Sequence, residues 1–270
     1  RDYAVTGVQT CALPISDSSR DSSGNGAPVK GDSGGTIDVM VLYTPAARSA
    51  AGGTSAMQSL INLAVSETNT GYSQSEVIQR ARLVHSTEVS YTEVDFSTDL
   101  TRLKGKTDGY MDDIHALRNQ YGADLVVLLK GTGINEACGL GYLMIPSNSS
   151  TFESSAFCTV HLDCATGYYS FAHEMGHNMG SHHAHEDTTD PAMFSYSYGY
   201  KSPSKAWRTI MAYQCAGTSC TRINYWSNPG LRWTSTNELM GVSGTGSLAA
   251  DNHRSLNETA YTVADRKSVV

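Results

Sequence analysis

The sequence predicts an α/β (α+β) fold, with a mixed twisted sheet and helices in an N-terminal lobe, a central helix, and an irregular C-terminal lobe with a terminal helix. Three observations predict it. Apolar strand patterns alternate with helical stripes over residues 36–130. One short helical pattern then follows a stretch rich in glycine, serine and tyrosine. Beyond residue 181 almost nothing is periodic until a last helical pattern near the end.

Three segments of the N-terminal lobe have the pattern of strands. Residues 36–44 alternate and are rich in β-formers, so they predict a strand that Pro45 ends. Residues 81–94 alternate again and predict a second strand. Residues 123–130 form a continuous apolar run, which is typical of a strand buried on both faces of a sheet.

Two segments between these strands have the pattern of helices. Residues 54–72 carry an apolar stripe at helical spacing, with Thr54 as the candidate N-cap. Residues 108–121 carry another, and Gly122 is expected to end it. Two further helical patterns complete the expected elements, at 168–179 and 248–263.

The two ends of the chain differ from the segments between them. Residues 1–16 lack the basic n-region of a signal peptide, and residues 265–270 do not continue the last helical pattern. We expect both to be foreign, artefactual sequence, so that the natural signal peptide and pro-segment are missing. Residues 17–35, rich in Ser, Gly and Asp, are expected to be a disordered linker or pro-segment remnant. The folded domain is expected at 36–264.

The overall composition excludes several classes of protein. Apolar residues make up 40% and charged residues 17%, which is too apolar and too weakly charged for a disordered chain. The formal net charge is −7, whereas nucleic-acid binding needs a basic surface. No segment reaches the length of a membrane span. We therefore expect neither a nucleic-acid partner nor a membrane span.

The six cysteines contain no C-x-x-C pair, which excludes a zinc ribbon and a thioredoxin motif. Cys215 and Cys220 flank a loop of small residues that can close a disulfide. A second bridge between Cys138 and Cys164 would leave Cys158 unpaired. Bridges would place the protein in an oxidising compartment, and six free thiols in a cytosolic chain are the alternative.

The central helical segment reads FAHEMGHNMGSHH and carries the candidate chemistry. His173 and His177 are four residues apart, so on a helix their imidazoles can converge on one ion. Gly180 can adopt a positive φ and end the helix, which lets His183 return as a third ligand. Three imidazoles leave one position for water, the geometry of a catalytic zinc ion. Glu174 beside that ion can take the proton of the water and pass it to a leaving amine.

The complete pattern H-E-x-x-H-x-x-G-x-x-H, followed by a methionine turn, is the signature of metzincin metallopeptidases. The later stretch RTIMAY resembles that turn. The resemblance implies a metzincin-like fold in which the central segment is the active-site helix and Met211 forms an apolar floor beneath the metal. Tyr213 resembles the tyrosine that in astacin-like and serralysin-like metzincins ligates zinc and then donates to the oxyanion. A packing role is the alternative for Tyr213.

Other polar residues near the motif have less defined expectations. His182 and His185 are not expected to bind the ion, because a fourth imidazole would block the water position. The snake-venom-like branch has aspartate directly after the third histidine, whereas this chain has Ala184. A supporting carboxylate must therefore come from elsewhere, with Glu186 and Asp187 as candidates.

From about residue 36 to 263 the chain resembles the bacterial peptidyl-Asp metalloendopeptidases, a reprolysin-like metzincin group. The stretches that carry the resemblance include ACGLGYLM, HLDCATGYYSFAHEMGHNMG, WRTIMAYQC and SCTRINYWSNP. The resemblance implies a secreted bacterial zinc endopeptidase that cuts on the amino side of aspartate in protein or peptide substrates. We expect a monomer. Calcium is compatible with a secreted protease, but no D-x-D-x-D-G loop indicates it.

An acidic side chain after the cut bond, at P1′, requires a cation in the S1′ pocket, ideally arginine. In metzincins the segment after the methionine turn builds much of that wall, and Arg222 is the only cation between Met211 and Arg232. Arg208 is the alternative. Rival functions are a metzincin with broad or apolar P1′ preference, an inactive zinc-bound binding or adhesion module, and a histidine-rich metal-binding protein. Glu174 argues against the inactive module, since a structural zinc site needs no general base.

Overall fold

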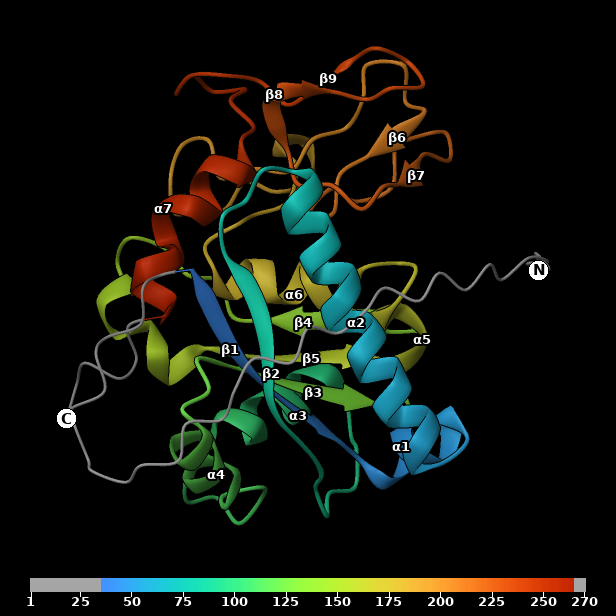
Figure 1. Ribbon diagram of the computed structural model, residues 1–270, viewed down its shortest axis with the longest axis vertical. Helices are drawn as coiled ribbons and strands as arrows, with labels where there is room; N and C mark the ends of the chain where they lie inside the picture. The colour runs from blue at the N-terminus through green and yellow to red at the C-terminus, as the bar shows by residue number, and fades with distance from the viewer. Residues whose placement is uncertain (1–34, 265–270) are drawn as a thin grey trace, which may run out of the picture. The chain divides into compact units, whose positions relative to one another are not determined.

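The computed structural model describes residues 35–264, so the expected foreign ends and nearly all of the expected linker lie outside the described residues. The main sheet has five strands in the order β2-β1-β3-β5-β4 (Figure 1). Its neighbours pair in parallel except β4, which is an antiparallel edge strand. The mixed sheet that the sequence predicts is confirmed. The strands are β1 (Thr36–Tyr43), β2 (Arg80–Glu88), β3 (Leu125–Lys130), β4 (Gly139–Gly141) and β5 (Phe157–His161).

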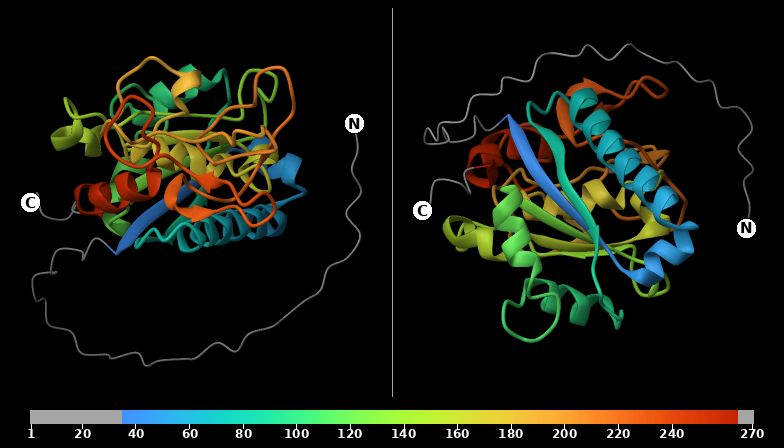
Figure 2. Two further views of the ribbon diagram at one scale, coloured as in Figure 1. Left: turned by 90° about the horizontal axis from the view of Figure 1, so that it is seen from above. Right: turned by 60° about the horizontal axis from the view of Figure 1, so that its bottom comes forward.

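Helices cover both faces of this sheet, as Figures 1 and 2 show. Side chains alternate along β1, so Val39 and Val41 pack under α2, α6 and α7, whereas Met40 and Leu42 pack against α3 and α4. All six residues of β3 are buried, which explains its continuous apolar sequence. The helices are α1 (Pro45–Ala51), α2 (Thr54–Gln74), α3 (Phe96–Lys104), α4 (Ile114–Tyr121), α5 (Leu162–Ala165), α6 (Ser170–Asn178) and α7 (Asn252–Ala264).

Two predicted boundaries at the first helices are wrong or incomplete. Gly53, not Thr54, is the N-cap of α2, and Thr54 is the first helical residue. Pro45 ends the first strand as predicted, but it also begins α1, a helix that the sequence analysis missed. Proline suits that position because its missing N–H would have no partner there. The hydroxyl of Thr44 caps the helix by accepting from the amide of Ala47 at 2.9 Å.

Two further elements are shorter than predicted. The second strand ends at residue 88 rather than 94. The helix predicted at 108–121 begins only at Ile114, because Gly109 and Met111 have positive φ values of 85° and 54°. Asp112 Oδ2 accepts from the Gly109 amide at 3.0 Å, and this aspartate turn prevails over the apolar stripe. Gly122 ends the helix in the left-handed conformation, as predicted.

The C-terminal lobe contains two small sheets and mostly irregular chain, as the sequence predicts. The strands are β6 (Trp207–Arg208), β7 (Thr221–Arg222), β8 (Asn228–Arg232) and β9 (Leu239–Met240). Among the described residues, no helix is both long and apolar enough to cross a bilayer.

The structure contains the two disulfides that the sequence analysis expected. Cys138 pairs with Cys164, which joins the start of β4 to α5, and Cys215 pairs with Cys220 just before β7. Cys158 is the free cysteine among the described residues and is buried in β5. Burial raises the pKa of its thiol well above the usual value, so the thiol stays protonated.

Candidate active site

The active-site helix α6 is fully enclosed, with all nine of its residues buried. It ends in a glycine turn, because Gly180 has a φ of 83° and its amide donates to His177 O at 3.1 Å. The amide of Ser181 then donates to Gly176 O at 2.9 Å. This turn reverses the chain and brings His183 back over the helix.

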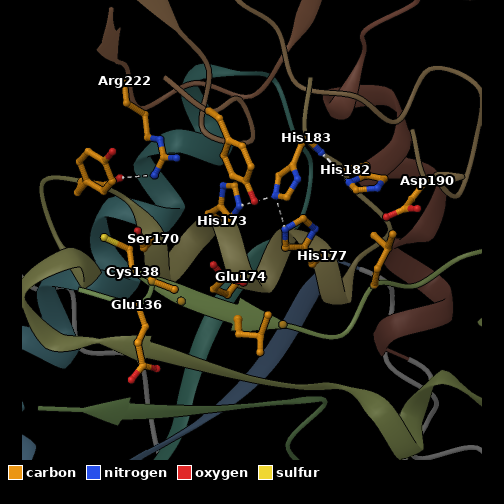
Figure 3. Close-up of a pocket in the computed structure, with 17 residues that line it drawn as sticks. Glu136, Cys138, Ser170, His173, Glu174, His177, His182, His183, Asp190 and Arg222 are labelled. Carbon is orange, nitrogen blue, oxygen red and sulfur yellow. Dashed lines mark hydrogen bonds between the residues drawn. The ribbon is translucent and has the colours of Figure 1, made fainter. Parts of the chain in front are cut away.

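Three imidazoles converge at this turn (Figure 3). Nε2 of His183 lies 3.2 Å from Nε2 of His173 and 3.0 Å from Nε2 of His177. Nδ1 of His173 faces Ile210 O at 2.8 Å, and Nδ1 of His177 faces Ser181 O at 3.0 Å. Because a carbonyl oxygen only accepts, both Nδ1 atoms carry the proton, and both Nε2 atoms keep a lone pair for a metal.

The donor set fits zinc, which prefers imidazole nitrogens and a small coordination number. Its candidate ligand atoms all lie within 4.8 Å of one another. Burial lowers the pKa of His177 to about 4 and lowers the pKa values of His173 and His183 well below the usual range. The neighbouring imidazoles lower these pKa values further. The rings are therefore neutral at physiological pH, as metal binding requires.

Glu174 lies beside the three histidines and is buried. Desolvation raises its pKa to about 8, and the nearby Arg222 opposes this rise. A carboxyl group with a pKa near neutrality can both accept and return a proton. The position of Glu174 and its pKa suit the general-base role that its place in the motif predicts.

Two glycines of β4 make room for this carboxyl group. A Cβ atom on Gly139 would lie 2.6 Å from both Cγ and Oε1 of Glu174, and one on Gly141 would lie 3.0 Å from Glu174 O. The distance at Gly139 is shorter than real Cβ contacts, and that at Gly141 is tighter than most of them. The sequence analysis did not assign these glycines a role, although both lie in the ACGLGYLM stretch. Their spacing of two, on one face of a strand, was the signal that could have identified them.

Replacing Gly139 by alanine is expected to displace Glu174 and to lower kcat on the order of 100-fold, the effect of a misplacement of about 1 Å. Zinc content should not change, because the histidines are untouched. Gly246→Ala is the matched control, since no atom lies within 4 Å of a Cβ atom there. A Gly139→Ala enzyme with wild-type kcat would contradict the packing argument.

Met211 lies against the turn of α6 that carries the first two histidines. It is fully buried, and a Cβ atom on Gly176 would lie 2.8 Å from its Sδ atom. Gly176 is thus the residue that lets the methionine approach the helix. This contact places an apolar side chain next to the histidines, as the resemblance implies.

Tyr213 lines the same pocket, and its ring centroid lies 4.0 Å from that of His183. Burial and the carboxylates of Glu174 and Asp187 raise the pKa of the phenol, so it remains a hydrogen-bond donor. Asp187 does not support an imidazole, because its Oδ2 accepts from the Tyr213 amide at 2.8 Å. Glu186 lies 3.9 Å from Lys201 and is exposed, so neither candidate carboxylate supports a histidine.

The two other histidines of the cluster have partners away from the three converging nitrogens. Nδ1 of His182 accepts from the His183 amide at 2.8 Å, and its Nε2 lies 3.2 Å from the Thr188 hydroxyl. His185 Nε2 lies 2.8 Å from Ala249 O.

The two candidate arginines lie side by side, because they pair in register between β6 and β7. Arg222 lines the pocket, and its Nη1 donates to Tyr168 O at 3.1 Å while its carbon Cζ lies 4.5 Å from the Tyr168 ring centroid. Arg208 is buried outside the pocket lining, where it donates to Ala212 O, Cys220 O and the Tyr168 hydroxyl. Arg222 is thus the candidate arginine that lines the pocket, whereas Arg208 is bonded to the residues behind it.

Arg222 retains unused hydrogen-bonding capacity. Its Nε is buried and has no partner among the described residues. Burial and the charge of Arg208 lower its pKa to about 10, which still leaves it charged at neutral pH. The pocket therefore offers a positive charge on one side of the histidines, as Figure 3 shows.

Together, three converging histidines, two of them buried, a buried carboxyl group beside them and a pocket lined by the edge strand β4 are typical of a metallopeptidase. The sequence comparisons identify the family. Residues 33–227 match Metallo-peptidase family M12, and the chain belongs to that family. The match agrees with the resemblance found in the sequence.

Several bacterial relatives carry the name peptidyl-Asp metalloendopeptidase. The protein of Stenotrophomonas maltophilia strain R551-3 is 45% identical over 235 residues, which cover 85% of this chain and 52% of the relative. The protein of Xanthomonas campestris pv. campestris is 41% identical over 255 residues, covering 93% of this chain and 57% of the relative. That of Pseudomonas fragi is 34% identical over 201 residues, 73% of this chain and 98% of the relative. The chain thus spans about half the length of the first two relatives.

Among solved structures, one titled as a chaperone-substrate complex matches with a TM-score of 0.64 at 18% identity. The match covers 85% of this chain and 38% of that chain. At this identity the likeness concerns the fold alone.

Proposed function

We propose that this protein is a secreted, zinc-dependent endopeptidase that hydrolyses peptide bonds on the amino side of aspartate. The observation that carries the proposal is the convergence of three neutral imidazoles, with Nε2 separations of 3.0 and 3.2 Å, beside buried Glu174. The relatives named peptidyl-Asp metalloendopeptidase support the same activity.

In the proposed mechanism His173, His177 and His183 would hold the ion. Zinc bound there would supply Lewis acidity for the substrate carbonyl and for the attacking water. Glu174 accepts a proton from the attacking water and then delivers it to the leaving amine nitrogen. Tyr213 donates a hydrogen bond to the oxyanion that develops on the former carbonyl oxygen. The buried setting of Glu174 keeps its proton affinity high enough for both transfers.

Arg222 supplies the proposed preference for aspartate. Its guanidinium lines the pocket, remains charged and is held by the Tyr168 carbonyl and ring. A carboxylate at P1′ can pair with it through charge-assisted hydrogen bonds. An apolar P1′ side chain would leave that partly buried charge without an anion, which disfavours the alternative of an apolar preference.

The test is digestion of a denatured protein mixture by zinc-loaded enzyme, with and without a zinc chelator. Mass spectrometry would read the new N-termini. Chelator-sensitive products that begin mostly with aspartate would support the proposal. Chelator-sensitive products with other first residues would retain a zinc peptidase with a broader preference. Absence of cleavage by folded, zinc-loaded protein would favour the binding-module alternative.

Replacing Arg222 by leucine is expected to lower kcat/KM for cleavage before aspartate by roughly 10- to 100-fold, the size of hydrogen bonds to a charged group. Cleavage before alanine should change little, so the ratio of the two rates is the informative quantity. The matched control is Arg232→Leu, because Arg232 is exposed and bonds only the nearby Asn237 carbonyl among described residues. An unchanged preference in Arg222→Leu would remove this residue from the specificity pocket.

We also propose an extracellular location and a monomeric state. The disulfides Cys138–Cys164 and Cys215–Cys220 are typical of an oxidising compartment. Every residue of the proposed site comes from one chain, so the chemistry needs no second copy. Detection of the protein in culture medium and its elution volume in gel filtration would test these two points.

A further inference from the structure

We propose that Asp187 is a positioning residue, which holds the main chain of Tyr213 so that the phenol stays beside His183. The inference rests on the proposed peptidase function and extends it to a residue outside the zinc motif. Asp187 touches neither the histidines nor the substrate path in the described contacts. It acts through Tyr213.

The Asp187 carboxylate joins two segments with its two oxygens. Its Oδ2 accepts from the Tyr213 amide at 2.8 Å, and its Oδ1 pairs with Lys201 Nζ. The side chains of Asp187 and Lys201 are each only 9% exposed. A largely enclosed carboxylate whose oxygens both have cationic or N–H partners has little freedom to rotate.

The segment around Tyr213 has little else to fix it. It lies outside any helix or strand, between the turn at Ala212 and the Cys215–Cys220 loop. The Tyr213 side chain is 46% exposed, so packing restrains the ring only in part. Among the described residues, Asp187 is the acceptor for the Tyr213 amide. Without that bond the main chain would still be held at Ala212 O, which accepts from Arg208 and Arg222. It would lose the hydrogen bond at the Tyr213 amide itself.

The position of Asp187 in the chain adds a second connection. It lies in the short helical turn His185–Asp187, which follows His183 directly after Ala184. The same loop therefore carries the third imidazole and the acceptor for the tyrosine amide. The loop thus carries the His183 ring at one end and, through Asp187, holds the main chain of Tyr213 at the other. The centroids of the two rings lie 4.0 Å apart.

A double-mutant cycle with Asp187→Ala and Tyr213→Phe tests the inference. Tyr213→Phe is expected to lower kcat on the order of 100-fold, the size of losing one oxyanion donor. Asp187→Ala should lower kcat by about tenfold or more in the wild-type background, and by less than about twofold in the Tyr213→Phe background. Zinc should remain at one ion per chain in every variant, and KM should change less than kcat.

Two further variants separate positioning from folding. Asp187→Asn keeps an oxygen that can accept from the amide, so it should lose less activity than Asp187→Ala. Glu186→Ala is the matched control, because this neighbouring carboxylate is exposed and its ion pair among the described residues is with Lys201, at 3.9 Å. It should retain wild-type kcat in both backgrounds.

A readout independent of turnover is amide hydrogen exchange in the metal-free protein. Exchange of the peptide containing Tyr213 should be faster in Asp187→Ala than in wild type, while exchange across β1 and β3 should be unchanged. Equal losses of kcat from Asp187→Ala in both backgrounds would overturn the inference and indicate a general structural role. Wild-type kcat in Tyr213→Phe would overturn it as well. A zinc-loaded wild type without peptidase activity would instead reject the proposed function, and hydrogen exchange would still test the link between Asp187 and Tyr213.

Discussion

Replacing Glu174 by glutamine is expected to lower kcat by a factor on the order of 100 to 10,000, the usual contribution of a general acid–base group. The substitution keeps the shape of the side chain, so the close packing of Gly139 and Gly141 around it is preserved. It removes the carboxyl group that we propose takes the proton of the attacking water. Zinc stoichiometry should remain one per chain, because glutamine replaces no ligand.

The control for this experiment is Glu186→Gln, which makes the same chemical change at an exposed carboxylate near the site. It should turn over like wild type. Measurement of kcat and bound zinc on the same samples separates lost chemistry from lost metal. A Glu174→Gln enzyme that retained wild-type kcat would show that another group performs the proton transfers.

The same variant should also change how folding depends on pH in the metal-free protein. Burial raises the pKa of Glu174 to about 8 in the folded chain, against about 4.3 in an unfolded chain. Between these values the folded chain keeps a proton that the unfolded chain has released, so the contribution to stability is lost as pH rises. Glutamine has no such proton. As pH rises from about 5 to about 8, the melting temperature of the wild type should therefore fall relative to that of the variant.

Replacing His183 by alanine is expected to have the largest effect on the metal. It removes one of three converging nitrogens, so that only His173 and His177 of α6 would remain of the histidines in this set. Zinc affinity should fall by more than about 100-fold, the upper cost of removing a group that merely supports a ligand. Peptidase activity should disappear at zinc concentrations that saturate the wild type.

Thermal unfolding gives the matching physical readout. Zinc binds the folded state, so added zinc should raise the melting temperature of the wild type but not that of His183→Ala at the same concentration. His185→Ala is the control, because this imidazole contacts Ala249 O instead of the three converging nitrogens. It should keep both zinc binding and the thermal shift. Full zinc affinity in His183→Ala would mean that a different residue completes the set.

The features that could be predicted from the sequence are those that depend on the spacing of residues close together in the chain. His173 and His177 follow from helical periodicity, and Gly180 follows from the conformational freedom that a reversal needs. The strand at β3 was predicted because burial on both faces leaves a continuous apolar run. In each case a few neighbouring residues contain the whole signal.

The features that were missed depend on contacts between distant segments. The role of Gly139 appears only when β4 is placed over α6, and that of Asp187 only when its loop meets Tyr213. The helix α3 was missed because its signal is an aspartate cap, Asp95, before a short and mostly polar segment. In sequence Arg222 was the candidate and Arg208 the alternative, and only the folded arrangement of β6 and β7 shows that Arg222, and not Arg208, lines the pocket.

The disulfide between Cys138 and Cys164 also determines where the cleft can change its width. Cys138 lies directly before β4, which lines one side of the cleft. Cys164 lies in α5, just before α6, which lines the other side. The disulfide therefore links these two sides of the cleft at the end where Figure 3 shows Cys138 and Arg222. At the opposite end, near His182 and Asp190, the described residues contain no such link. We therefore expect the cleft to change its width less at the Arg222 end, where this disulfide lies, than at the opposite end.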